Sequence, residues 1–156
     1  GEDIYTLSTE KLAIFRRRQI GLIYQFFNLI PTLNVEENIT LPCELDGQTV
    51  DKKRLDKLID ELGLNGRKTH LPEELSGGQQ QRVSIGRALI NRPAIVLADE
   101  PTGNLDKKNS DEIVELLRRA NQEYRQTIIM ITHNLEIAKT ADRVIVIEDG
   151  KIIREG

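Results

Sequence analysis

The chain has 156 residues, of which 38% are hydrophobic, and this is enough to build the core of one domain. A net charge of -3 gives no overall basic field, so we expect no nucleic-acid partner. The single cysteine, Cys43, excludes an internal disulfide and fits a reducing compartment. No apolar run approaches the roughly 18 residues that indicate a membrane span.

The first half of the chain predicts helices around one strand. Residues 8–18 show a weak helical pattern, and residues 20–24 form an apolar, strand-like run. Asn34, followed three residues later by Glu37, is typical of a helix-starting capping pair. The apolar residues within 51–62 fall on one face of a helix.

The second half of the chain alternates between the two kinds of element. The expected helices and strands are, in chain order, 77–91, 94–98, 107–122, 127–132, 134–139 and 143–148. This alternation predicts an α/β fold with a parallel sheet and helical crossovers. The runs AIVLA, TIIMI and RVIVI are apolar on both faces, which predicts helices on each side of the sheet. The sequence DGKIIREG, with a turn at Asp149 and Gly150, predicts a final hairpin strand.

Two adjacent carboxylates, Asp99 and Glu100, follow the apolar strand in the sequence IVLADEP. One carboxylate can hold Mg²⁺, usually through water, while its neighbour polarises a water molecule for attack on a terminal phosphate. We assign Asp99 to magnesium and Glu100 to the water. Thr132 and His133 end the next strand, and ligands of parallel sheets gather at this edge. The alternative is a capped strand end with two solvated acids.

A second motif, LSGGQQQR, places Ser76 and two glycines at the start of a helix. Free backbone N–H groups at a helix start form an anion site, and glycines let a phosphate approach closely. Ser76 can add a hydroxyl donor. From these residues alone, an ordinary helix N-cap explains the motif better than an anion site does.

LSGGQQQR, followed by LADEPTGNLD and then ITH, resembles the ATP-binding cassette (ABC) family over nearly the whole chain. The resemblance implies a P-loop NTPase-like parallel sheet flanked by helices, with a helical signature subdomain. We expect that subdomain at about residues 26–92, and parts of the catalytic core at residues 1–25 and 93–156.

The resemblance also implies a role for each motif residue. Glu100 would be the catalytic carboxylate and His133 the switch histidine that contacts the γ-phosphate. Gln25 would be the Q-loop glutamine that senses magnesium and the attacking water, together with the magnesium residue Asp99. The implied cofactors are ATP and Mg²⁺. The further residues expected at the nucleotide belong to the signature and the D-loop: Ser76, Gly77, Gly78, Gln79 and Asp106. A helix N-cap is an additional role for Asp106.

The family resemblance implies two kinds of partner. Two such domains face each other head to tail around two ATP molecules, so each signature helix serves the opposite subunit's nucleotide. The sequences GxDIYxLS, YQFFNLIPTLNVEENI and ADEPTGNLD resemble exporters of the lipoprotein-releasing, macrolide and antimicrobial-peptide group. This group implies an FtsX-like ABC permease and a place at the cytoplasmic face of the membrane. The apolar residues within 26–38 would contact the permease, or some of them fill the core.

One part of such a site has no match in the chain. A P-loop has the pattern GxxxxGK[ST], and the only Gly-Lys pair here, Gly150-Lys151, stands in a turn without the required preceding glycine. The chain opens on Gly1 and its only methionine is Met130. We therefore expect a fragment that lacks the start of the domain and that binds MgATP poorly alone.

The chain also resembles cassette proteins that are not transporter subunits. Cassette ATPases of DNA repair and chromosome structure carry a long coiled coil, but only about 50 residues without sustained heptads separate Gln25 from Leu75. Translation-factor relatives carry two cassettes in one chain, and the segment that resembles a partner-docking region favours a transporter instead. A catalytically inactive regulatory half is disfavoured by the intact Glu100 and His133.

Overall fold

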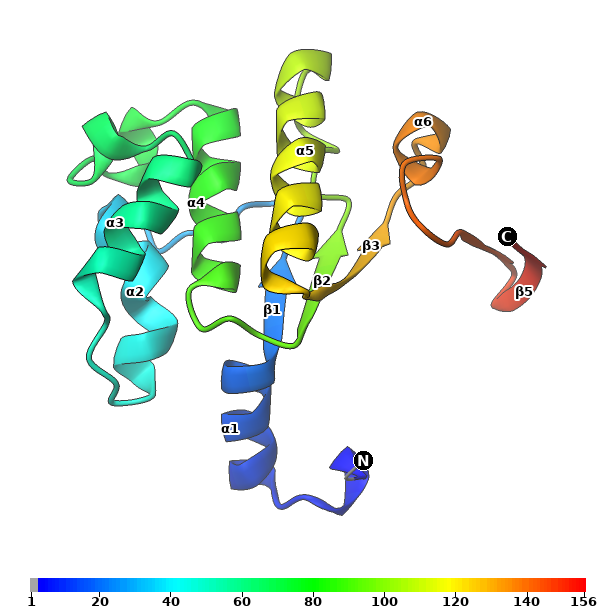
Figure 1. Cartoon of the computed structure of the whole chain (residues 1–156), viewed down its shortest axis with the longest axis horizontal. Coiled ribbons are helices and arrows are strands. Elements are labelled where there is room, and N and C mark those ends of the chain that lie inside the picture. The colour runs from blue at the N-terminus through cyan, green and yellow to red at the C-terminus, as the bar shows by residue number, and fades with distance from the viewer. Residues whose placement is uncertain (1–2) are drawn as a thin grey trace.

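The computed structural model describes residues 3–156, so the first two residues of the opening motif lie outside the described part (Figure 1). Three parallel strands form a sheet in the order β1-β2-β3. They are β1 (Ile20–Ile23), β2 (Ile95–Asp99) and β3 (Thr127–Ile131). Helices connect the strands, as a parallel sheet requires. The predicted α/β class is confirmed.

The helices agree with the sequence-based expectations to within a few residues at each end. They are α1 (Thr9–Gln19), α2 (Val35–Leu45), α3 (Lys52–Glu61), α4 (Gly77–Leu89), α5 (Lys107–Tyr124) and α6 (Leu135–Ala138), with 3-10 turns at Ile4–Thr6, Asn65–Arg67 and Pro72–Glu74. Figure 1 shows α4 and α5 beside the sheet, α2 and α3 beyond α4, and α1 projecting away from the other helices.

Side chains at the helix starts explain where these helices begin. Asn34 and Glu37 form the predicted capping box of α2, with each side chain bonded to the other residue's backbone N–H. Asp106 accepts a hydrogen bond from the backbone of Asn109 and so caps α5. These bonds satisfy N–H groups that have no partner inside the helix.

One continuous cluster of buried apolar side chains holds the sheet and helices together. Ile23 of β1 and Val96 of β2 face the helices, while Ile39 of α2, Ile59 of α3 and Val83 of α4 complete the cluster with no more than 1% exposure. The cluster therefore runs through both of the expected subdomains. Their boundaries at residues 26–92 remain a prediction.

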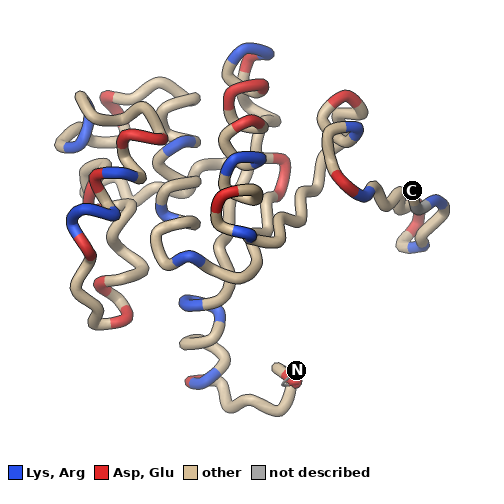
Figure 2. Tube along the Cα trace, viewed as in Figure 1, with Lys and Arg blue, Asp and Glu red and all other residues tan. Residues whose placement is uncertain are grey.

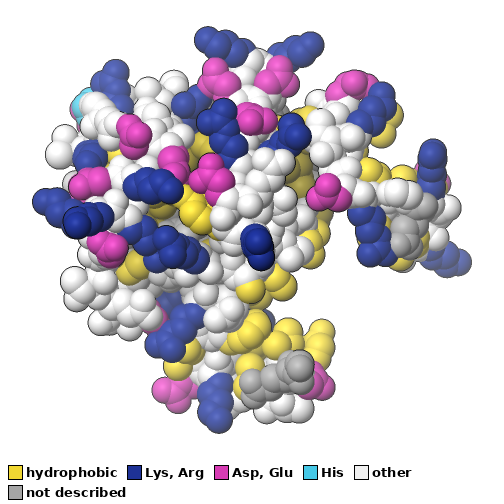
Figure 3. All heavy atoms as spheres, viewed as in Figure 1, with side chains coloured by type: hydrophobic (Ala, Val, Ile, Leu, Met, Phe, Trp, Pro, Cys, Tyr) yellow, Lys and Arg dark blue, Asp and Glu magenta, His cyan; other side chains and the backbone are white. Residues whose placement is uncertain are grey.

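The opposite face of the sheet is open among the described residues, which contradicts the expectation of helices on both sides. Leu22, Leu97 and Ile129 are neighbours across the three strands. Their exposed fractions are 43%, 36% and 52%. Apolar strands predict a buried sheet, but they do not say which segment covers each face. Figure 3 shows hydrophobic side chains at the surface beside the strands and around α1.

The run at 143–148 does not join the parallel sheet, and that expectation is wrong. It forms β4 (Ile145–Glu148), which pairs antiparallel with β5 (Lys151–Glu155) in a separate hairpin. Asp149 and Gly150 both have positive φ, at 48° and 74°, and make the predicted tight turn between the two strands. The turn places β5 beside β4. The backbone hydrogen-bonding groups of β4 therefore pair with β5 and not with a strand of the parallel sheet.

Charged side chains lie mainly on the helices and loops, and the strands β1 and β3 carry none (Figure 2). Among residues 3–156, every helix is either too short or too polar to cross a membrane.

Candidate functional site

The carboxyl ends of the three parallel strands meet at one edge of the sheet. Ile23 pairs with Ala98, and Asp99 pairs with Ile131, so the chain leaves all three strands at the same level. Gln25, Glu100 and His133 follow directly after these ends. The three residues that sequence reasoning assigned to a common site are thus brought to one edge, where ligands of open parallel sheets bind.

Glu100 and His133 are in direct contact at this edge. Oε1 of Glu100 lies 2.7 Å from Nδ1 of His133 and accepts a hydrogen bond of 3.1 Å from the His133 backbone N–H. The Glu100 N–H in turn donates to the Ile131 carbonyl at 3.0 Å. Both side-chain contacts use the same carboxylate oxygen. The other oxygen, Oε2, is left to accept a proton or to orient a water molecule.

Glu100 also has a strained backbone, with φ at +45°. Residues with a side chain disfavour this left-handed region, and such strain occurs often at functional sites. The bend turns the chain sharply after β2 and keeps the Glu100 side chain only 19% exposed, whereas His133 is 81% exposed. The Glu100 carboxylate is therefore largely shielded from solvent, and the His133 imidazole is exposed.

Gln25 is tied to the turn that follows Glu100 by Asn104, a residue to which sequence reasoning gave no role. The Asn104 side chain donates to the Gln25 carbonyl at 3.1 Å, and Nε2 of Gln25 donates to Oδ1 of Asn104 at 3.3 Å. Gly103 allows this approach, because a Cβ there would lie 2.8 Å from Nε2 of Gln25. With its amide nitrogen engaged, Gln25 presents its amide oxygen as a ligand for a cation or a water.

Asp99 fits a Mg²⁺ ion that is held mostly by water and phosphate. It is exposed at the end of β2, and no hydrogen bond or ion pair within residues 3–156 involves its side chain. The described residues contain no group of three or more His, Cys, Asp or Glu side chains that could hold a metal. Mg²⁺ is commonly bound by one or two carboxylates together with phosphate oxygens, so this donor set fits magnesium.

The signature residues form a capped helix start. Oγ of Ser76 accepts from the Gln79 backbone N–H at 3.3 Å, and the Gln79 side chain accepts from the Ser76 N–H at 2.9 Å. Ser76 and Gly77 are exposed, while Gly78 is buried against the side chain of Asn109. These hydrogen bonds confirm that Ser76 is the N-cap of α4. A role of these residues at a nucleotide remains compatible with their exposure and stays a prediction.

Asp106 likewise serves as a helix cap in this structure. Its carboxylate accepts hydrogen bonds from the backbone and side-chain nitrogens of Asn109, at 2.8 and 2.9 Å. The backbone hydrogen bond from Asn109 is the main cause that lowers the pKa of Asp106 below its ordinary value. The carboxylate is thus ionised and oriented, and its predicted place across a dimer interface is not tested by this geometry.

The apolar residues after Gln25 divide between the surface and the core. Phe26 is 71% exposed and Ile30 41% exposed, whereas Leu29 packs against the core cluster. Buried Asn38 holds this loop, since its side chain accepts from the Ile30 N–H at 2.9 Å and donates to the Leu33 carbonyl at 2.7 Å. The loop therefore presents Phe26 and Ile30 outward from a fixed backbone.

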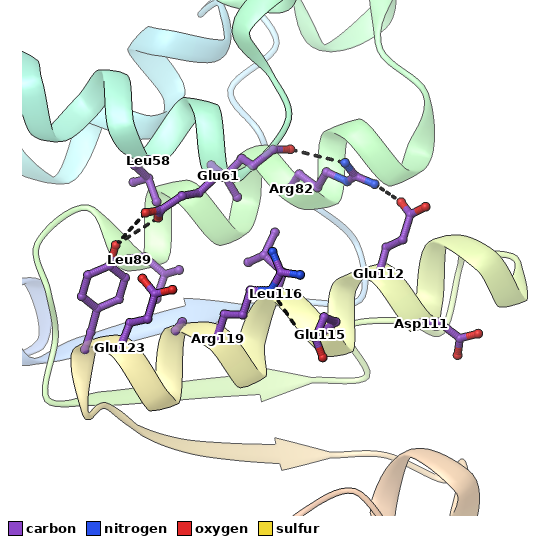
Figure 4. A pocket seen from close by; sticks show the side chains of 13 residues that line it. Leu58, Glu61, Arg82, Leu89, Asp111, Glu112, Glu115, Leu116, Arg119 and Glu123 are labelled. Atoms are coloured by element: carbon purple, nitrogen blue, oxygen red, sulfur yellow. Dashed lines mark hydrogen bonds and ion pairs between the residues drawn. The ribbon is translucent and has the colours of Figure 1, made fainter.

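A cavity of about 570 Å³ lies away from this edge, between α3, α4 and α5. Figure 4 shows Leu58 and Leu89 on its apolar side, with ion pairs between Arg82 and Glu112 and between Arg119 and Glu115. None of the predicted site residues lines it. The strand ends, and not this cavity, remain the candidate functional site.

A sequence model of the ABC transporter family matches residues 2–103. The chain belongs to this family. The ABC signature and the DE pair after β2 both fall within the matched region, while the histidine after β3 lies beyond it.

Curated ABC relatives support the membership over the full chain. The macrolide export ATP-binding/permease protein MacB of Brucella melitensis is 47% identical over 99% of this chain and 24% of its own length. The uncharacterized ABC transporter ATP-binding protein YbbA of Escherichia coli is 42% identical over 99% of the chain and 69% of its own length. The lipoprotein-releasing system ATP-binding protein LolD 1 of Rhodopirellula baltica is 42% identical over 100% of the chain and 69% of its own length. The chain thus spans about a quarter of the MacB relatives.

Solved ABC structures confirm the fold. A dimeric post-hydrolysis state of the ATP-binding cassette MJ0796 with ADP and Pi aligns with a TM-score of 0.84 at 39% identity. The alignment covers 97% of this chain and 68% of the MJ0796 chain. A second dimeric structure of MJ0796 aligns with a TM-score of 0.83 at 40% identity, over 96% of this chain and 67% of that chain.

Proposed function

We propose that this chain carries the catalytic and coupling residues of an ATP-hydrolysing subunit that powers export or release of a substrate through a membrane permease. The observation that carries the proposal is the contact between Glu100 and His133 at the carboxyl edge of the sheet. A carboxylate that is held at one oxygen by an imidazole, and that stands beside an unpartnered Asp99, matches the needs of water attack on a phosphate.

Each residue has a distinct part in the proposed reaction. Glu100 orients and polarises the attacking water through its second oxygen, and His133 reaches from its exposed position to the γ-phosphate. Asp99 and the amide oxygen of Gln25 would hold Mg²⁺, which would neutralise charge on the phosphate oxygens. The chemistry at this edge is thus positioning and charge stabilisation, with one group that takes a proton from water.

The signature residues act on a second copy of the domain. Ser76 and Gly77 are exposed at the start of α4 and are followed by the buried Gly78, and backbone N–H groups at such a helix start favour an anion. We propose that they bind the ATP of a partner domain in a head-to-tail dimer, with Gln79 supporting the cap and Asp106 near the interface. The dimeric MJ0796 cassettes, to which this chain is similar, support this arrangement.

The membrane partner and the cargo are proposed from the named relatives. MacB is named for macrolide export and LolD 1 for lipoprotein release, so we propose an FtsX-like permease and a macrolide, lipoprotein or antimicrobial peptide as cargo. The exposed Phe26 and Ile30 would contact that permease at the cytoplasmic face of the membrane. Exposed aromatic and aliphatic side chains on a fixed loop are typical of interfaces.

The test is MgATP binding and hydrolysis, measured on the 156-residue chain and on the full-length protein. The chain contains no P-loop pattern, and that loop supplies most of the charge-assisted contacts to a triphosphate. We therefore propose that the folded chain, checked by circular dichroism, binds MgATP weakly and that the full-length protein hydrolyses it. A full-length protein without ATPase activity contradicts the proposal, and tight binding by the chain contradicts our account of the site.

A further inference from the structure

The loop between β1 and α2, residues 24–34, is attached to α4 through its backbone carbonyls. Nε2 of Gln81 donates to the Tyr24 carbonyl at 3.3 Å. The Arg87 guanidinium donates to the Phe27 carbonyl at 3.0 Å and to the Asn28 carbonyl at 2.6 Å. Two side chains of one helix thus hold three carbonyls of the loop that presents Phe26. We call this loop the β1 loop.

Gln81 connects the β1 loop to the catalytic strand as well. The same Nε2 atom donates to the Pro101 carbonyl at 2.7 Å, one residue after Glu100. Gln81 is fully buried, so its two bonds join the end of β1, the bend after β2 and the middle of α4 at one point. At the start of α4, a Cβ on Gly77 would lie 3.6 Å from the Phe27 ring.

Breaking these bonds costs free energy, because Gln81 is fully buried and Arg87 is partly buried. A buried amide or guanidinium that loses its acceptor keeps its desolvation cost without a partner. Partial burial also lowers the pKa of the Arg87 guanidinium. Separation of the β1 loop from α4 would leave these donors without acceptors, so the hydrogen bonds favour a loop and helix that stay together.

We propose that Gln81 and Arg87 are positioning residues that couple the β1 loop to the signature helix and to the bend at Glu100. A partner that presses on Phe26 then moves Ser76 and reorients the carboxylate through these two side chains. The inference rests on the proposed ATPase function; Gln81 stands in LSGGQQQR without a role assigned from the sequence, and Arg87 lies outside that motif.

The experiment imitates a partner with a chemical probe on the full-length protein. Phe26→Cys is labelled with fluorescein maleimide, since position 26 is exposed and the Cys43 thiol is buried. ATP hydrolysis is compared with and without the label in an otherwise unchanged background, in Gln81→Leu and in Arg87→Met. The matched control is Ser84→Ala, which alters another fully buried polar residue of α4 whose hydroxyl has no partner among the described residues.

We expect the label to change kcat by about fivefold or more in the unchanged and Ser84→Ala backgrounds, with little effect on KM for ATP. In Gln81→Leu and Arg87→Met the label should leave kcat nearly unchanged. Arg87→Lys retains one cationic donor and should restore part of the label's effect on kcat. This variant also provides a test at position 87 if Arg87→Met does not fold. A label effect that persists in the folded variants, or that is absent in the unchanged background, overturns the inference. Absence of hydrolysis without label instead contradicts the proposed function.

Discussion

Nδ1 of His133 lies 2.7 Å from Oε1 of Glu100, and the His133 backbone N–H bonds the same oxygen, so two strand ends converge on one carboxylate atom. β2 supplies the acid and β3 supplies its support. This relationship fixes the direction of the second carboxylate oxygen without help from a ligand.

Glu100→Gln in the full-length protein should abolish ATP turnover while ATP binding is retained. The amide keeps the shape of the side chain and can still accept the hydrogen bond from the His133 N–H, but it cannot take a proton from water. Loss of one positioned base lowers kcat by roughly 100-fold or more. Steady-state hydrolysis and equilibrium nucleotide binding measure the two effects, and near-normal turnover would refute the assignment of Glu100.

Gly78→Ala should destabilise the junction between α4 and α5. A Cβ at position 78 would clash with Oδ1 of Asn109, whose side chain is fixed by Asp106. Overpacking of this kind costs about 1–3 kcal/mol. Thermal unfolding should therefore show a lower Tm for Gly78→Ala, while Gly77→Ala serves as control because its nearest contact would be an ordinary 3.6 Å. In an Asn109→Ala background, Gly78→Ala should lower the Tm much less, because the clashing amide is absent. An equal loss of Tm in both backgrounds would contradict this explanation.

Ser76→Ala should lower the free energy of unfolding by about 1 kcal/mol, because Oγ of Ser76 accepts the hydrogen bond of the Gln79 N–H. Denaturant unfolding measures this change. Ser76→Phe tests the proposed dimer separately: position 76 is exposed, so the larger ring should leave the domain folded and obstruct closure. Size-exclusion chromatography with ATP should then give a monomer, and a dimer of this variant would contradict the proposed interface.

The ion pairs of Asp46 should make the attachment of α1 sensitive to acid. Asp46 joins Arg17 and Arg18 of α1 at 3.3 and 2.8 Å, and the hydrogen bond from Arg18 is the main cause that lowers the pKa of Asp46. Since the folded pKa lies below the unfolded value of about 3.9, the stabilisation is complete above that value and is lost as the pH falls through the folded pKa. The stability difference between the unchanged chain and Asp46→Asn should be constant from about pH 5 to 7 and shrink below about pH 4. Arg18→Gln should remove most of this difference, and a pH-independent difference would contradict the mechanism.

Local sequence signals were sufficient for most elements of the fold. The capping pair at Asn34 and Glu37, the cap at Asp106 and the apolar strand before Asp99 each act within a few residues, so their structures follow from short-range chemistry. The pairing of β4 did not follow, because an apolar run does not specify whether a sheet or a nearby hairpin strand is its partner. The open face with Leu97 was missed for a similar reason.

The residues at the candidate site were named by the family resemblance, whereas those that support them were not. Gln81 and Arg87 bond carbonyls 57 to 60 residues away, and Asn104 bonds Gln25 across 79 residues. Backbone carbonyls carry no residue identity, so no motif in the sequence encodes these partners. Asn104 stands within ADEPTGNLD, one of the sequences that resemble the exporter group, and its hydrogen bonds with Gln25 give this residue a structural role.

The left-handed backbone at Glu100 has a consequence for how this position tolerates change. Asn and Gly adopt a φ near +45° more easily than Glu, and relief of such strain is worth about 1–3 kcal/mol. The amino acids that best suit the bend after β2 therefore lack the acid that the proposed reaction requires. A library selected only for thermal stability would drift toward inactive proteins at this one position, and the wild-type residue marks a compromise in which resistance to heat is given up for activity.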